Sequence, residues 1–383
     1  MKYVAFYDTP ENKAEGRSYQ LSAVNKINYI CTVLNRLGHH VEIISPSVTE
    51  NRKGCKGKVV DLSEGISLKL FSCMGMGSLP KRIARRIFGR VRLLWELVRN
   101  TRKGETVLVY HSASCAATVA LARKLKGFRL ILEVEEIYAD VTGNERDRAW
   151  EYRLFEAADA FVFPTQLLNE KINKTGKPCV LIHGTYQAER EREEKLFHDG
   201  KIHCVYAGTL DPRKGGVMAA AAAEFLPENY HIHILGFGSS EETKAMREVT
   251  ESLAVTCDCG ISYDGLLSGE DYIRFIQSCQ IGLSPQDPDA AFNGTSFPSK
   301  VLSYLASGLQ VVSIRIPAIA DSAVGSYLTF YDRQTPEEIA KAILSVDVCG
   351  GEDPRRILEK LDQKFEREMA ELLPAGSGES ENT

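Results

Sequence analysis

The stretch HCVYAGTLDPRKGG, residues 203–216, decides the fold of this chain. Its apolar start, His203–Ala207, predicts a buried strand, and the glycine-rich residues that follow lead into a predicted helix at Met218–Phe225. Glycine lets the backbone approach a ligand closely, Arg213 and Lys214 are cations, and a helix start exposes amide groups. The stretch therefore predicts an anion site at a strand-to-helix turn, with a plain turn carrying solvated basic residues as the alternative.

Short apolar runs alternate with helical patterns on both sides of this turn. The expected strands are Tyr3–Tyr7, Val41–Ser45, Thr106–Tyr110, Leu130–Glu133, Ala160–Phe163, Val180–His183, His231–Leu235, Ile281–Ser284 and Val311–Ile314. The expected helices are Ser18–Leu37, Ala116–Leu125, Gly269–Ser278, Pro298–Ser307 and Pro336–Val346. Strands separated by crossover helices are typical of parallel sheets covered on both faces, so the fold class is α/β with two doubly wound, Rossmann-like domains.

A charged stretch separates the two series. We expect an N-terminal domain at 1–187, a linker at 188–200, a C-terminal domain at 201–348, a helix at 353–373 and a disordered tail at 374–383. Two such domains are expected to face one another across a cleft that binds ligands at the strand ends.

Composition excludes several classes of protein. Of 383 residues, 44% are hydrophobic and 26% charged, as in an ordinary globular protein. The first thirty residues carry several charges and no run of eighteen apolar residues exists, so we expect neither a signal peptide nor a membrane-spanning helix, and a cytoplasmic protein. Residues 1–187 hold 29 Lys and Arg against 19 Asp and Glu, and the remainder 18 against 32, which predicts that the first half faces something anionic.

A second helix start lies at 294–308 (GTSFPSKVLSYLASG). Ser299 and Lys300 fall in the first turn, where a cation opposes the helix dipole. A lysine in that position makes sense if an anion binds there too.

Residues 201–345 contain the two helix starts described above, a G-x-G turn at 236–238 between them, and F-P-S-K-x-x-x-Y-L-A-S-G followed by Q-V-V-S. In these motifs residues 201–345 resemble nucleotide-sugar glycosyltransferases of the GT-B fold, nearest the family-4 (group 1) retaining enzymes. The resemblance implies a donor diphosphate site and a nucleoside site in the second half. The diphosphate site would comprise Gly208, Thr209, Arg213, Lys214, Ser299 and Lys300, and the nucleoside site Gly265, Leu266 and Ser303. It also implies transfer without a metal and without a cofactor beyond the donor.

This chain departs from the family pattern at three positions. Thr209 stands where an arginine is usual, and Arg213 is the candidate to replace it. Thr295 and Ser303 stand where the family has two glutamates, so the bidentate acceptor for a ribose is lost. These changes keep two alternatives open: a catalytically weak GT-B subunit that activates a partner transferase, and a GT-B sugar-nucleotide epimerase.

The first half offers further candidates at strand ends. Glu135, in LEVEEIYAD (132–140), and His111 are the catalytic candidates, and Glu135 falls near where the family carries a histidine. The alternative for Glu135 is a solvated loop paired with Arg146 or Arg148, and the alternative for His111 is a structural role. The candidates on the acceptor side are Asn12, Arg17 and His183, for which solvated-loop or structural roles are the alternatives.

Residues 79–103 carry nine Lys and Arg and one acid, with apolar residues at helical spacing. This pattern predicts a basic amphipathic helix that binds an anionic membrane surface, or else packs on its own domain. No nucleic-acid recognition motif accompanies the charge. Cys257 and Cys259 form the one close cysteine pair, too little for a zinc site, and no metal site is expected.

Together these features predict a hexosyltransferase-type enzyme. It would move a sugar from a nucleotide-diphosphate donor to a glycan or lipid-linked acceptor in surface polysaccharide biosynthesis, peripheral on the inner face of the cell membrane. The sugar, the base, the acceptor and the oligomeric state are not encoded in these patterns.

Overall fold

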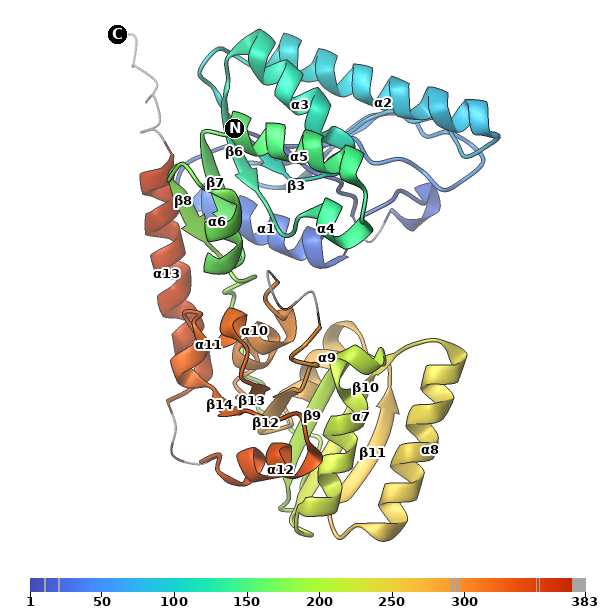
Figure 1. Cartoon of the computed structure of the whole chain (residues 1–383), viewed down its shortest axis with the longest axis vertical. Coiled ribbons are helices and arrows are strands. Elements are labelled where there is room, and N and C mark those ends of the chain that lie inside the picture. The colour runs from blue at the N-terminus through green and yellow to red at the C-terminus, as the bar shows by residue number, and fades with distance from the viewer. Residues whose placement is uncertain are drawn as a thin grey trace. The chain divides into compact units, whose positions relative to one another are not determined.

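The computed structural model describes residues 1–9, 12–19, 21–290, 293, 296–348, 350 and 352–373. The chain divides into two compact units, one made of Met1–Thr185 with the residues from Lys364 onward, the other of Tyr186–Gln363 (Figure 1). The predicted first domain ends at residue 187 and the first unit at Thr185. The predicted disordered tail, 374–383, lies outside the described residues.

Unit 1 is built on an eight-stranded sheet in the order β3-β4-β2-β1-β5-β6-β7-β8. Its strands are β1 (Lys2–Val4), β2 (Val41–Ser45), β3 (Lys58–Ser63), β4 (Ile66–Leu70), β5 (Thr106–Tyr110), β6 (Arg129–Glu133), β7 (Ala160–Phe163) and β8 (Cys179–Leu181). Neighbouring strands are parallel except β3, which runs antiparallel to β4. This hairpin escapes the sequence prediction because β3 alternates between half-buried and exposed residues and has no continuous apolar run.

The helices of unit 1 are η1 (Lys13–Glu15), α1 (Leu21–Arg36), α2 (Leu79–Asn100), α3 (Ala113–Lys126), α4 (Tyr138–Thr142), α5 (Glu145–Ala157) and α6 (Gln166–Ile172). α3 contacts α2 and α5, and the three helices lie side by side in Figure 1. Their apolar residues form one core with the buried faces of the sheet, including Phe128 and Phe161. α13 (Pro354–Leu372) begins in unit 2 and ends in unit 1, where Phe365 stacks on Tyr29 of α1.

Unit 2 has a six-stranded sheet in the order β11-β10-β9-β12-β13-β14, parallel throughout. The strands are β9 (Ile202–Thr209), β10 (Tyr230–Phe237), β11 (Gly260–Gly265), β12 (Ile281–Ser284), β13 (Gln310–Ile314) and β14 (Thr329–Tyr331). The helices are η2 (Pro212–Lys214), α7 (Gly216–Ala221), η3 (Ala222–Phe225), α8 (Ser240–Thr256), α9 (Gly269–Ile276), α10 (Ser299–Ala306), α11 (Pro317–Ala320), η5 (Gly325–Tyr327) and α12 (Pro336–Leu344).

The strand order reverses at one strand in each sheet. β1 lies between β2 and β5, and β9 lies between β10 and β12. Because parallel crossovers are right-handed, a reversal places helices on both faces, which is the expected doubly wound arrangement.

The predicted linker is bound to unit 2 along its length. The amide of Glu189 donates to the Ala306 carbonyl, Arg192 pairs with Glu270, and the Lys195 ammonium donates to the Gln277 carbonyl. This segment is therefore part of unit 2.

Candidate functional site

The carboxyl end of β9, where the strand order of unit 2 reverses, carries two facing glycines. Gly208 of β9 is in register with Gly236 of β10. A Cβ at Gly236 would lie 1.9 Å from the Gly208 carbonyl oxygen, and one at Gly208 would lie 3.1 Å from the Lys300 Nζ. Glycine at both positions therefore lets the strand ends and this lysine come together, at the place where open α/β sheets bind ligands.

Lys300 lies in the first turn of α10 and its ammonium is buried. Among the described residues its Nζ has no hydrogen-bond partner, and it lies 3.9 Å from the centroid of the Tyr206 ring. Burial, and then the charge of Lys214, lower the pKa of Lys300 to about 7. A buried cation without an acceptor is costly, so this arrangement favours an anion as its missing partner.

Lys214 ends η2 and is the second cation at this edge. Gly215 follows it with φ +78°, and a Cβ there would lie 1.7 Å from the Pro285 carbonyl oxygen, so only glycine fits the turn. Burial lowers the pKa of Lys214. The charge of Asp211 raises this pKa, and the charge of Arg213 lowers it. Since the charge of Lys214 also depresses the pKa of Lys300, the two ammonium groups share one electrostatic environment.

Arg213 and Thr209 lie beside these lysines. The guanidinium of Arg213 donates to the carboxylate of Asp211, its Nη2 at 2.6 Å, and is largely exposed. Thr209 is exposed at the end of β9, and its carbonyl accepts from the Tyr206 hydroxyl. Arg213 can therefore take the role of the arginine that the family has at position 209 only if its guanidinium breaks the contact with Asp211.

The start of α10 has no side-chain cap. Pro298 precedes the helix and its side chain cannot accept from the first amides, and Ser299 is exposed. An uncapped helix start attracts an anion, which adds to the two lysines. Thr295, one of the two replaced family positions, lies outside the described residues.

The candidates for nucleoside binding lie along the ends of β11 and α10. Gly265 ends β11 with φ +77° and open space around it, and Leu266 is 65% exposed. The hydroxyl of Ser303 lies 3.4 Å from that of Tyr272. An exposed apolar residue beside a bare glycine suits the flat face of a base, while Ser303 offers one hydroxyl in place of a carboxylate.

In unit 1, two glutamates at the end of β6 hold a lysine of α1. The ammonium of Lys26 from α1 pairs with Glu135, lies 3.9 Å from Glu133 and donates to the Ile182 carbonyl at 3.2 Å. Glu133 is fully buried and accepts from the Tyr3 hydroxyl. Burial raises the pKa of Glu133 to about 7, although the charge of Lys26 acts in the opposite direction.

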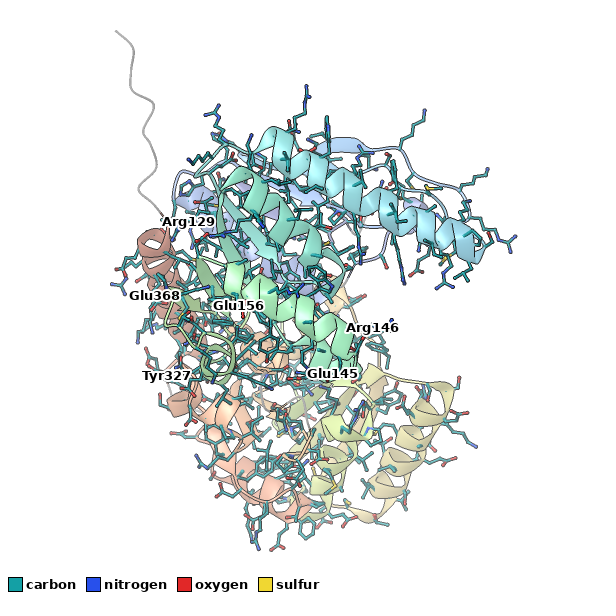
Figure 2. All side chains as sticks on the ribbon, turned by 45° about the horizontal axis from the view of Figure 1, so that its top comes forward. Arg129, Glu145, Arg146, Glu156, Tyr327 and Glu368 are labelled. Carbon is teal, nitrogen blue, oxygen red and sulfur yellow. The ribbon has the colours of Figure 1, made fainter. Side chains whose placement is uncertain are left out.

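Glu135 is not part of a solvated loop paired with arginine. Arg146 lies at the start of α5 in Figure 2, and Arg148 pairs with Asp140 and Glu145, while the partner of Glu135 is Lys26. Glu136 is half-buried, and burial followed by the charge of Glu135 raises its pKa. The two neighbours therefore occupy different environments.

The two candidate histidines are buried and neutral at neutral pH. His111 packs against Tyr138 and Phe155, and its Nε2 lies 3.4 Å from Glu151. The Nδ1 of His183 donates to the Pro164 carbonyl at 2.7 Å. Burial lowers the pKa of each histidine to about 4.

Asn12 and Arg17 belong to the network that holds the first loop. Asn12 donates to Asp8 and accepts from Lys58. The buried guanidinium of Arg17 donates to Glu15 and to the carbonyls of Ser47, Lys56 and Phe71, a set of bonds that fixes the fold. An acceptor-side role for either residue stays a prediction.

α2 is amphipathic, but most of its apolar stripe is exposed, and a different side of the helix packs on the core of unit 1. Leu93 and Leu97 are buried in the core of unit 1, with Glu96 paired to Lys69. The exposed apolar residues are Leu79, Ile83, Ile87, Phe88, Val91 and Trp95. No helix in the described part of the chain has the length and apolar character needed to span a membrane.

Sequence reasoning missed the pairing of Lys26 and a cluster of three histidines, His203, His231 and His233. Lys26 interrupts the apolar stripe of α1 between Val24 and Ile27, a signal that its charge has a buried partner. The H-x-H pattern of residues 231–233 places both of these side chains on one face of β10.

Three comparisons relate this structure to known proteins. Over 97% of this chain, the OtsA apo structure matches with a TM-score of 0.67 and 10% identity, covering 99% of that chain. A structure described as "Trehalose-6-phosphate from E. coli bound with UDP-2-fluoro glucose" matches with the same TM-score and identity, and 97% of each chain is covered. An alpha,alpha-trehalose-phosphate synthase (UDP-forming) from Burkholderia xenovorans in complex with glucose-6-phosphate also has a TM-score of 0.67 and 10% identity. The match covers 97% of this chain and 98% of that chain.

At this identity the structural likeness shows the fold, which is GT-B. The comparison with curated proteins gives no match. A family model for glycosyl transferases group 1 matches residues 201–346, which hold both lysines of the β9 edge. Residues 201–346 are therefore a glycosyl transferases group 1 domain, carried by a chain of GT-B fold, and the protein is a glycosyltransferase.

Proposed function

We propose that this glycosyltransferase moves a sugar from a nucleotide-diphosphate donor to a glycan or lipid-linked acceptor in the assembly of a surface polysaccharide. The buried ammonium of Lys300 carries this proposal, because it lacks a hydrogen-bond acceptor among the described residues and lies within the field of Lys214. A diphosphate supplies the acceptor that Lys300 lacks, and its charge is also attracted by Lys214.

Transfer is proposed to proceed without a metal and with retention of configuration. Lys214, Lys300 and the uncapped start of α10 supply the positive charge that stabilises a departing diphosphate. Retention is taken from the resemblance to group 1 enzymes. In a retaining transfer the donor phosphate can accept the proton of the acceptor, which leaves Glu135 a positioning role.

The acceptor is proposed to present a neutral hydroxyl near Lys26 and Glu135. The Burkholderia xenovorans neighbour is in complex with glucose-6-phosphate, so a sugar phosphate is the second candidate. Glu133 and Glu135 both flank the single ammonium of Lys26, and this cluster therefore offers no excess positive charge to a phosphate. A glycan or lipid-linked hydroxyl suits it better.

α2 is proposed to hold the protein on an anionic membrane at the cytoplasmic face. Its exposed apolar stripe runs along one side of the helix, next to the exposed cations Arg82, Arg86 and Arg90. Apolar insertion combined with adjacent arginines matches the chemistry of an anionic lipid surface.

Incubation of the purified protein with a panel of nucleotide sugars, with and without membrane extract, tests this function. Nucleotide release that depends on the extract and disappears in Lys300→Ala supports it. Release only after a second protein is added favours the activating subunit, and a changed sugar on an intact nucleotide favours the epimerase. Release with glucose-6-phosphate in place of the extract favours the sugar-phosphate acceptor.

A further inference from the structure

Three histidines lie together at the amino-terminal edge of the unit 2 sheet. His203 is near the start of β9, and His231 and His233 are near the start of β10, with His231 directly opposite His203. One ring nitrogen from each lies within 4.8 Å of the others. The five residues from His203 to Gly208 span about 17 Å of extended strand, so this cluster is remote from the donor edge.

Two of these rings are oriented by carboxylates on their outer sides. The Nε2 of His203 lies 3.0 Å from Asp199. The Nδ1 of His233 lies 3.1 Å from Asp264 and 3.1 Å from the Ser262 hydroxyl, which itself donates to Asp264. A neutral imidazole has one N–H, and a neighbouring carboxylate attracts it. Each outer nitrogen therefore takes the proton, and each inner nitrogen is left with a lone pair.

The inner nitrogens face each other. The Nδ1 of His203 and the Nε2 of His233 are 2.9 Å apart. Two lone pairs at this distance repel one another unless a cation lies between them. Carboxylates that fix the outer N–H, with inner nitrogens converging, are the arrangement by which proteins prepare histidines for a metal.

The surroundings suit an ion held in the structure. His203 and His233 are each 3% exposed, and Phe197 stacks on both rings at 4.1 and 4.7 Å. His231 is partly exposed and stacks on His233, and its Nε2 lies 3.1 Å from the Ser262 hydroxyl. One of its ring nitrogens is the third of the group. Tetrahedral zinc with Zn–N of about 2.0 to 2.1 Å separates two nitrogens by roughly 3.3 Å, a small widening of the observed gap.

We infer that His203, His233 and His231 bind one Zn²⁺ ion at the amino-terminal edge of the unit 2 sheet, with Asp199 and Asp264 as orienting carboxylates. The ion ties the segment that carries Phe197 and Asp199 to β9 and β10. It is structural, and sugar transfer at the opposite edge does not use it.

The full-length protein is first stripped with a chelator and dialysed, then titrated with Zn²⁺ by calorimetry and with Co²⁺ by visible spectroscopy. We expect one equivalent of zinc and the absorption bands of tetrahedral Co²⁺. With free Zn²⁺ at 100 times its Kd, the Tm should rise by about 5 to 10 °C. His233→Gln should abolish the stoichiometric binding, Asp264→Asn should weaken it about 10- to 100-fold, and exposed His40→Gln should change neither.

The inference is overturned if the stripped protein takes up less than stoichiometric zinc, or if His40→Gln and His233→Gln bind it alike. The inference is also overturned if zinc does not bind and the Tm falls as the pH rises, with a smaller fall in His233→Gln. That result would show that His203 and His233 share a proton in place of the metal. Nucleoside diphosphate affinity, measured on the same samples, reports on the donor edge separately and should not follow the zinc content.

Discussion

The ammonium nitrogen of Lys300 lies 3.9 Å from the centroid of the Tyr206 ring, and no hydrogen-bond acceptor reaches it within the described residues. The ring face attracts a cation, but this attraction does not replace the hydrogen bonds lost from water. The charge of Lys300 therefore acts in two directions: it destabilises the free protein, and it strengthens the binding of an anion at the end of β9.

Replacing Lys300 by methionine should separate these effects. We expect Lys300→Met to weaken nucleoside diphosphate binding by about 10- to 150-fold, which is about 1.5 to 3 kcal/mol for a charge-assisted hydrogen bond. The Tm of the free protein should rise, because methionine needs no buried acceptor. Lys214→Ala should show the same loss of affinity.

Calorimetric titration with UDP and GDP, together with thermal unfolding of the free variants, measures both effects. Lys244→Met is the matched control, since Lys244 is exposed on α8 and paired with Glu248. Unchanged affinity of Lys214→Ala and Lys300→Met for every diphosphate tested would refute the donor site.

The depressed pKa of Lys300 predicts that diphosphate binding takes up a proton. Burial and the charge of Lys214 lower this pKa to about 7, whereas an unfolded lysine titrates near about 10.4. Between these values the unfolded chain binds more protons, so the contribution of Lys300 to the free energy of unfolding rises with pH. A bound diphosphate favours the charged lysine, and affinity should fall as pH rises above about 7, by up to tenfold per pH unit.

Calorimetry at pH 8 in two buffers of different ionisation enthalpy measures this uptake. We expect close to one proton per diphosphate bound by the wild type and markedly fewer by Lys300→Met. Equal uptake by the two proteins would assign the proton to another group.

Glu133 should produce the opposite pH dependence in unit 1. Burial raises its pKa to about 7, and a free glutamate titrates near about 4.3. Between these values the folded protein binds more protons, so the contribution of Glu133 to the free energy of unfolding falls as pH rises from about 4.3 to 7. Glu133→Gln should flatten this slope in denaturant unfolding measured at pH 5 and pH 7.5, and an unaltered slope would mean that another group controls it.

Glu135 is expected to act on turnover and not on donor binding. Glu135→Gln should lower kcat by roughly 10²-fold with donor affinity nearly unchanged, as for one positioned group. Because the Lys26 ammonium holds this carboxylate, Lys26→Met should lose a similar factor, and the double variant little more. Glu136→Gln is the control, and a larger loss in that variant than in Glu135→Gln would mean that the wrong glutamate was chosen.

Much of the sheet architecture was predictable, because buried parallel strands are continuous apolar runs. The bounds predicted for Val41–Ser45, Thr106–Tyr110, Ala160–Phe163 and Ile281–Ser284 are confirmed. α8 was missed because only a few of its residues are buried and its sequence is largely polar. Its one strong signal was the capping box formed by Ser239 and Glu242.

The site was predictable where it depends on local sequence and not where it depends on strand pairing. Lys214 and Lys300 stand at helix starts, which their own neighbours reveal. The pairing of Lys26 with Glu135 joins residues 109 positions apart, and the contact of His203 with His233 depends on the register of β9 with β10. No periodicity along the chain encodes either distance.

The apolar stripe of α2 predicts reversible binding to anionic vesicles. Ile83, Ile87, Val91 and Trp95 are spaced by four residues and exposed, so they can insert together. Arg85 donates to the Thr49 carbonyl and Arg92 to Ser72, so changing these two would disturb the fold.

The exposed arginines 82, 86 and 90 are the better targets for substitution, although Arg90 donates one hydrogen bond of 3.3 Å to the Ser114 carbonyl. We expect the wild type to co-sediment with vesicles containing anionic lipid at low ionic strength and to be released by salt, since each cation near the surface contributes about 1 kcal/mol. The variant with these three arginines changed to Gln should bind at least tenfold more weakly. Ile83→Ser with Ile87→Ser should also weaken binding at low ionic strength, because two of the inserted apolar side chains are lost. The matched control changes Lys244, Arg247 and Lys341, three exposed cations of unit 2, to Gln. Equal sedimentation of the control and the α2 variants would make the exposed stripe a site for something other than a membrane.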